Sequence, residues 1–344
     1  MSSILVPAAE WSATLADPIE ALTWSPDGTR VGVAGVDGRL LLLDAANGCV
    51  TRELPGHAGG AFRIAWHPRD AVVASSGQDG RVQLWDPETG ANISSFPAGQ
   101  KWVEHLEWSP DGAWLAAGAG RTLTLWNWQR RVVTHEIKEH SATLTELCWR
   151  GDGQRVAAAS YGGIQVWDPL EGKHTDTLPC KTSLISAAWS PDNRWIVAGT
   201  QELSVQIWEL PFRPGEELAM RGFANKVRQL AWHHSGRYLA TGGSHDATVW
   251  DCCGAGPAGT EPERLQGHSG TVTTLDYQRS GNLLASGGAD GLVLLWNFKR
   301  SITPMREFQL RSPLTRVRWS PAGTAALAGC HDGTVHLLRP PSAD

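Results

Sequence analysis

Short segments that mix apolar and polar residues at strand-like spacing recur along the whole chain. Residues 103–108 and 272–277 show this pattern, and each is followed by a polar turn. A second apolar run comes next, and then a turn such as Asp79-Gly80 leads into a third run at 82–86. Asp and Gly tolerate the positive φ of a tight hairpin. With a polar fourth segment such as 91–96, the pattern predicts an all-β fold of four-stranded antiparallel units.

An aromatic marker residue ends the first strand of each unit and recurs about every 42 residues. It is tryptophan seven times and tyrosine once: Trp24, Trp66, Trp108, Trp149, Trp189, Trp232, Tyr277 and Trp319. We interpret these aromatic residues as packing between neighbouring units, because large rings dominate buried cores. The eight copies cover almost the entire chain.

The third strand ends on Trp85-Asp86 and Trp167-Asp168, and Gly56-His57 and Gly267-His268 precede two of the first strands. With the repeat length, these pairs resemble the WD40 family of β-propellers over roughly residues 10 to 339. The resemblance implies a propeller of four-stranded antiparallel blades, in a single domain over residues 1–344.

Eight units predict an eight-bladed β-propeller. The eighth unit lacks a fourth strand, because the chain ends directly after its third, at 340–344. We therefore expect the N-terminal segment around 10–15 to pair there and close the ring, which removes two exposed sheet edges. The alternative is a seven-bladed ring with a stray hairpin.

The resemblance also implies hydrogen-bonded tetrads of His, Ser, Asp and Trp within a blade. The full set occurs in two units, as His57, Ser75, Asp79 and Trp85, and as His268, Ser286, Asp290 and Trp296. We interpret both tetrads as structural rather than catalytic, because buried polar atoms need partners. In the sixth unit, Trp250 comes two residues early, and Cys252 is expected at the tryptophan position.

Charge and composition exclude several functions. The net charge of −5 offers no basic field for a phosphate backbone, so we expect no direct contact with nucleic acid. No stretch approaches the roughly 20 apolar residues of a membrane-spanning helix, so we expect no membrane association. The N-terminus lacks a basic segment followed by a long apolar run, which predicts a cytoplasmic protein.

The sequence also offers little cofactor or enzyme chemistry. Six scattered cysteines lack metal-binding spacing, so we expect reduced thiols and no metal. Residues 254–259 match a dinucleotide fingerprint, but Pro257 interrupts them and no helix follows. We therefore predict no cofactor and no catalytic residues.

Two classes of function remain. The resemblance implies a non-catalytic scaffold for one or more partner proteins, acting as a monomeric ring or as a subunit of a complex. The alternative is an enzyme, or a small-molecule or metal-binding propeller, with its site at the mouth of the central channel. The turns after the second strands carry Gln78, Ala119 and Ser160, which are poor in catalytic groups.

A partner-binding surface is predicted near units two to four. Gln100, Lys101 and Trp102 replace the small Gly-His loop, and a rigid aromatic residue beside a lysine is typical of interface hot spots. Gln78 and Tyr161, in flanking turns, are expected to extend this surface. The alternative is that Trp102 folds back over its own blade as ordinary packing.

Overall fold

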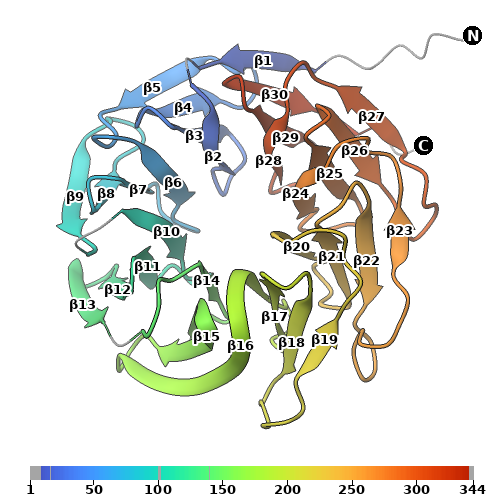
Figure 1. Cartoon of the computed structure of the whole chain (residues 1–344). Helices are drawn as coiled ribbons and strands as arrows, with labels where there is room; N and C mark the ends of the chain where they lie inside the picture. Colours follow the sequence, from blue (N-terminus) through green and yellow to red (C-terminus); the bar gives the residue numbers. More distant parts are fainter. Residues whose placement is uncertain (1–8, 16, 100–101, 139, 341–344) are drawn as a thin grey trace, which may run out of the picture.

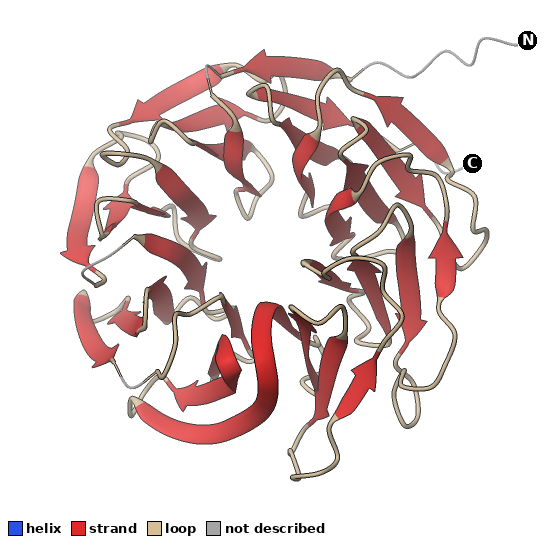
Figure 2. Ribbon diagram, in the orientation of Figure 1, coloured by secondary structure: helices blue, strands red, loops and turns tan. Residues whose placement is uncertain are grey.

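The computed structural model describes residues 9–15, 17–99, 102–138 and 140–340, and these form a ring of β-strands around a central opening (Figures 1 and 2). The strands of the first half are β1 (Trp11–Thr14), β2 (Ile19–Trp24), β3 (Arg30–Gly35), β4 (Leu40–Asp44), β5 (Val50–Leu54), β6 (Ala61–Trp66), β7 (Val73–Gly77), β8 (Arg81–Trp85), β9 (Asn92–Pro97), β10 (Val103–Trp108), β11 (Trp114–Ala119), β12 (Thr122–Asn127), β13 (Val132–Ile137), β14 (Glu146–Trp149) and β15 (Val156–Asp168). Those of the second half are β16 (Lys173–Trp189), β17 (Trp195–Thr200), β18 (Val205–Glu209), β19 (Leu218–Met220), β20 (Gln229–Trp232), β21 (Tyr238–Gly242), β22 (Ala247–Asp251), β23 (Glu263–Leu265), β24 (Val272–Tyr277), β25 (Leu284–Gly288), β26 (Leu292–Trp296), β27 (Arg306–Gln309), β28 (Leu314–Trp319), β29 (Ala326–Cys330) and β30 (Thr334–Leu338).

The middle strands of each sheet form the core. Every residue of β11 and β17 is buried, because the neighbouring sheets cover both of their faces. The outer strands have the opposite pattern, and β5 is exposed at all but its last residue. This gradient explains why the second and third strands are nearly continuous apolar runs whereas the fourth is polar.

The predicted number of blades is wrong. Strand pairing among the described residues gives seven sheets, six of four strands and one, β14 to β19, of six. The eight-unit pattern placed the markers Trp149 and Trp189 in separate blades, but β16 runs through 17 residues and pairs with β15 and with β17. The sequence of β16 contains no Asp-Gly or Pro-Asp turn that would interrupt it. Tyr161 of β15 pairs with Ser183, where the partner of β16 changes from β15 to β17. Seven is the number given by the alternative interpretation.

The N-terminal segment closes the ring as expected. Strand β1 pairs antiparallel with β30, with Trp11 opposite Leu337 and Thr14 opposite Thr334. The Trp11 side chain is 9% exposed, and its indole Nε1–H donates to the carbonyl of Ala45 at 2.9 Å. Because Ala45 follows β4 in the next sheet, β1 joins both sides of the closure.

A β-bulge recurs near the start of the innermost strands. The register shifts between Ile19 and Ala21 in β2, between Ala61 and Arg63 in β6, and between Leu314 and Arg316 in β28. A bulge re-aims the side chains that follow it. The residue three positions before most of the aromatic markers therefore lines the central channel, as Arg63 and Arg316 do.

The sixth repeat unit departs from the expected register. Trp250 pairs with Leu239 across the β21–β22 ladder, as Trp85 pairs with Val73 in the second unit. Trp250 therefore occupies the tryptophan position, and the expectation for Cys252 is wrong. Trp250 is as far along the chain from its marker Trp232 as Trp126 is from Trp108, and the two tryptophans pair at equivalent places in their ladders.

Candidate functional site

The two predicted tetrads have complete hydrogen-bond chains. In the second unit, Trp85 Nε1–H donates to Ser75 Oγ at 2.8 Å, Ser75 Oγ lies 2.8 Å from His57 Nε2, and His57 Nδ1 lies 2.9 Å from Asp79. The seventh unit repeats this arrangement among the other four predicted residues, with 2.8 Å from Trp296 to Ser286, 2.8 Å from Ser286 to His268 and 3.1 Å from His268 to Asp290.

Burial keeps both tetrad histidines neutral. It lowers the pKa of His57 and of His268 below the usual range, although each faces a carboxylate that favours the proton. A neutral ring that donates from Nδ1 to Asp accepts at Nε2, which suits the Ser hydroxyl. Ser75 and Ser286 are 0% exposed, so neither hydroxyl reaches a substrate.

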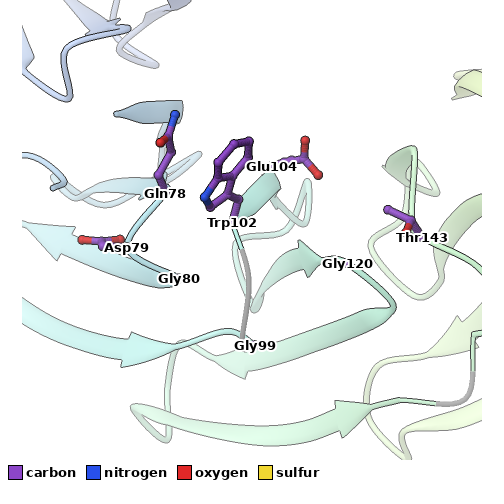
Figure 3. Close-up of a pocket in the computed structure, with 8 residues that line it drawn as sticks. All are labelled: Gln78, Asp79, Gly80, Gly99, Trp102, Glu104, Gly120 and Thr143. Atoms are coloured by element: carbon purple, nitrogen blue, oxygen red, sulfur yellow. The ribbon is translucent and has the colours of Figure 1, made fainter. Parts of the chain in front are cut away.

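A cavity of about 520 Å³ opens beside Trp102, on the face where chains enter the innermost strands (Figure 3). Gln78, Trp102, Glu104 and Thr143 line it, together with Asp79 and three glycines. The Trp102 side chain is 52% exposed, and its ring centroid lies 5.8 Å from that of Phe62 on β6. Trp102 thus leans on the neighbouring sheet and leaves about half of its surface to solvent.

The structure brings together only part of the predicted partner surface. Gln78 and Trp102 line the same cavity, side by side in Figure 3. Tyr161 is exposed but is not among the described residues that line this cavity. Gln100 and Lys101 lie outside the described residues. Glu104, which the sequence analysis missed, faces the cavity from β10 and is recognisable as the second residue of that strand.

A second cavity, of about 610 Å³, occupies the central channel, and the sequence analysis did not identify it. Its lining comes from the innermost strands and includes four arginines and two glutamates: Arg63, Arg228, Arg316, Arg318, Glu107 and Glu146. Five of these residues stand three or one positions before an aromatic marker, as Arg63 does before Trp66 and Arg318 before Trp319. That spacing was a usable signal, because strand residues two apart share a face.

The charged groups of the channel influence one another. Desolvation of the Glu107 carboxyl group within the channel raises its pKa, and the nearby Glu146 carboxylate raises it further. Burial opposes ionisation of Glu146 as well, but His105, whose Nδ1 lies 3.5 Å away, helps to lower its pKa. Burial and the positive charges of Arg318 and Arg63 lower the pKa of Arg316 to about 10. The Arg316 guanidinium is therefore close enough to those of Arg63 and Arg318 to be repelled by both.

No helix within the described ranges is long and apolar enough to cross a membrane. A closed ring of antiparallel sheets around a channel defines the molecule as a β-propeller. The family model for the WD domain, G-beta repeat, matches residues 48–86, 90–127, 131–168, 172–209, 217–251, 259–297 and 303–337. These segments make up most of the chain, so it belongs to the WD40-repeat family. Seven matched repeats, like the seven sheets, replace the expected eight.

Several curated proteins are similar to this chain. THO complex subunit 3 of Arabidopsis thaliana is 24% identical over 239 residues, which are 67% of this chain and 73% of that protein. The anaphase-promoting complex subunit cdc20 of Dictyostelium discoideum is 28% identical over 160 residues, 45% of this chain and 31% of that protein. The guanine nucleotide-binding protein subunit beta of Saccharomyces cerevisiae is 22% identical over 214 residues, 58% of this chain and 49% of that protein. This chain therefore spans less than half of the last two proteins.

Among solved structures, the computationally designed Ika8 protein has a similar fold. The two chains superpose with a TM-score of 0.83 at 21% identity, covering 97% of this chain and 100% of the designed one. At that identity the likeness concerns the fold alone.

Proposed function

We propose that this protein is a non-catalytic scaffold that binds a partner protein through the cavity beside Trp102. The observation that carries the proposal is a tryptophan 52% exposed at the rim of a cavity of about 520 Å³. A half-exposed aromatic ring already braced by Phe62 loses little conformational entropy on binding, which is typical of interface hot spots. The three relatives above are named as subunits, which supports a partner protein for this chain too.

The chemistry of the cavity favours a partner segment that presents a lysine or an arginine. Two carboxylates line the cavity, Asp79 and Glu104. Asp79 is already bonded to His57, so Glu104 is the freer of the two. A cation beside Glu104 would also lie against the face of Trp102, where aromatic rings attract positive charge.

The tetrads support a non-catalytic role. Their Ser, His and Asp side chains resemble a hydrolytic triad in residue type, yet each serine hydroxyl is fully buried and accepts a hydrogen bond from a tryptophan. We also propose a single domain over 1–344, cytoplasmic location, no direct contact with nucleic acid, and a monomeric ring or a subunit of a complex. Limited proteolysis, cell fractionation, a filter-binding assay and light scattering test these four points in turn.

The test of the partner surface uses the strongest protein interactor of the wild-type chain, purified and titrated. Trp102→Ala should weaken its binding about tenfold, or about 1.4 kcal/mol, with the melting temperature unchanged. Leu170→Ala is the matched control. Leu170 is 69% exposed in the turn between β15 and β16, and it does not line the cavity beside Trp102. If the Trp102→Ala variant is destabilised but still binds the partner normally, Trp102 belongs to the core and the interface lies elsewhere.

Glu104→Gln separates the charge of the cavity from its shape. If a basic side chain occupies the cavity, this variant should weaken binding, and the loss should shrink at high salt because surface charges are screened. Equal binding by the wild type and Glu104→Gln at every salt concentration would refute a cationic partner segment while leaving the role of Trp102 open to its own test.

A further inference from the structure

We infer that the central channel contains a binding site for a small phosphate-bearing anion, between the guanidinium groups of Arg63, Arg316 and Arg318. This site is separate from the cavity beside Trp102 and does not depend on the proposed function. It rests on the position of the three arginines, on the balance of charge in the channel and on the space available.

The position follows from the repeat. Arg63 on β6 and Arg316 on β28 stand at equivalent places on the two strands that flank β2, where the small Ala21 takes the same place. Arg318 lies two residues beyond Arg316, so it shares the channel-facing side of β28. Because Ala21 is small, it leaves space between the side chains of Arg63 and Arg316. Thr23 of β2 lines the same cavity.

Carboxylates of the described residues compensate the arginines in part: Glu107 and Glu146 interact electrostatically with Arg63, and Glu146 also with Arg316. Glu20 Oε1 lies 3.8 Å from Arg63 and 3.7 Å from Arg316, which is beyond hydrogen-bond distance for both. Asp276 interacts electrostatically with Arg318, but its carboxylate accepts the Trp319 backbone N–H at 2.7 Å. The Glu20 carboxylate thus lies near two guanidinium groups without a hydrogen bond to either.

Donor groups are available for an anion. Each of the three guanidinium groups donates to the carbonyl of the residue before it, with distances of 3.0 Å for Arg63, 2.8 Å for Arg316 and 3.0 Å for Arg318. A guanidinium carries five N–H donors in a planar fork that suits phosphate oxygens. Most of these donors therefore remain for a ligand, and a dianion would also relieve the repulsion among the three positive charges.

The rest of the channel selects the kind of anion. A cavity of about 610 Å³ accommodates a small phosphate ester but not a nucleic-acid duplex. Glu107 and Glu146, on β10 and β14, add negative charge to that side of the channel. The phosphate end should therefore lie toward β28, β2 and β6, and hydrogen-bond donors of the ligand toward the two glutamates.

Isothermal titration of the full chain with inorganic pyrophosphate tests the site. We expect saturable binding that is about tenfold weaker in Arg316→Gln and in Arg63→Gln, since each substitution removes a charge-assisted hydrogen bond. Arg213→Gln is the control, because its side chain is 75% exposed on the loop outside β18 and should bind as the wild type does. Glycerol 2-phosphate, titrated in parallel, tells whether the site accepts an organic ester as well as the free inorganic ion.

A variant that is expected to strengthen binding distinguishes the loss of the site from misfolding. Glu20→Gln removes the carboxylate that competes with the ligand, so pyrophosphate should bind about threefold or more tightly than to the wild type. Circular dichroism confirms that each variant is folded before titration. The inference is overturned if the wild type shows no saturable binding at an ionic strength matched with chloride, or if Arg63→Gln and Arg316→Gln both bind as well as the wild type does.

Discussion

Single side chains connect one sheet of the ring to the next through the residue that follows the aromatic marker. His67 Nε2 lies 2.9 Å from the carbonyl oxygen of Gly112, and His233 Nε2 lies 3.0 Å from that of Gly281. Gln278 donates in the same way to the carbonyl of Gly323 at 2.7 Å. Each bond crosses to the next repeat unit, and each of the three side chains is buried. These contacts lock adjacent sheets at one end, because a buried donor left without its acceptor is costly.

The tetrad histidines give the first prediction at this scale. His57→Ala and His268→Ala should each lower the free energy of unfolding by about 1–3 kcal/mol, because each leaves a buried serine hydroxyl without its histidine partner. Denaturant midpoints measure the effect. His174→Ala is the matched control, because His174 is exposed on the outer part of β16 and its loss should change little. Midpoints equal to the wild type for both tetrad variants would show that the tetrads add nothing to stability.

How far single residues were predictable depended on spacing. The resemblance to the WD40 family implied that His57, Ser75, Asp79 and Trp85 lie together, and the structure shows the hydrogen bonds among them. The channel charges come from different repeats, and only the bulge that re-aims Arg63 and its equivalents brings them together. The spacing of these residues before the aromatic markers was a usable signal, but the sequence analysis did not apply it, so the channel charges were missed.

At the scale of elements, closure depends on β1. The strand contributes a ladder to β30 and buries Trp11 against the turn after β4, where Gly48 leaves room for the ring: a Cβ at Gly48 would lie 2.4 Å from it. Without Trp11, the first and last sheets would lose a buried indole and its hydrogen bond to Ala45. Both edges at the closure would then separate more readily.

We therefore predict that Trp11→Ala lowers the free energy of unfolding by about 3–5 kcal/mol, the usual cost of truncating a buried tryptophan. Trp102→Ala is the same substitution at a half-exposed site and should leave stability almost unchanged. Chemical denaturation of the two variants in parallel compares them directly. If both unfold at the wild-type midpoint, β1 is not needed to hold the ring closed.

Elements were easier to predict than their boundaries. The four-strand pattern and the closing strand followed from alternation and from the missing final strand. The continuous strand β16 did not, because the eight aromatic markers indicated separate units where the backbone continues and pairs on both sides. The position of Trp250 was misjudged because it was compared only with units like the second, whereas the third unit places Trp126 at the same distance from its marker.

The whole molecule carries two separate surfaces on one rigid ring. The cavity beside Trp102 lies on one face, between the second and third units, whereas the arginines line the channel from β28 to β6. The turns that bound the first cavity are held by the His57 tetrad through Asp79, which lines that cavity as well. A destabilised tetrad should therefore disturb the partner surface before it disturbs the channel.

The whole ring should also lose stability in mildly acidic solution. Burial lowers the pKa of five histidines in the folded state: His57, His67, His233, His268 and His336. A folded-state pKa below the unfolded value of about 6.5 means that the unfolded chain binds more protons, so stability rises with pH. This contribution is fully present above about pH 6.5 and is lost as the pH falls through the lowered pKa values.

Glu107 opposes this trend, because its raised pKa makes the folded state bind a proton that the unfolded chain releases. Five histidines outnumber it, so we predict a melting temperature that falls steadily from pH 7.5 to pH 5 in a buffer of constant ionic strength. The double variant His57→Ala, His268→Ala should start from a lower melting temperature at pH 7.5 but show a shallower decline, because two of the five titrating groups are gone. A decline as steep as that of the wild type would assign the acid sensitivity to groups other than the tetrads.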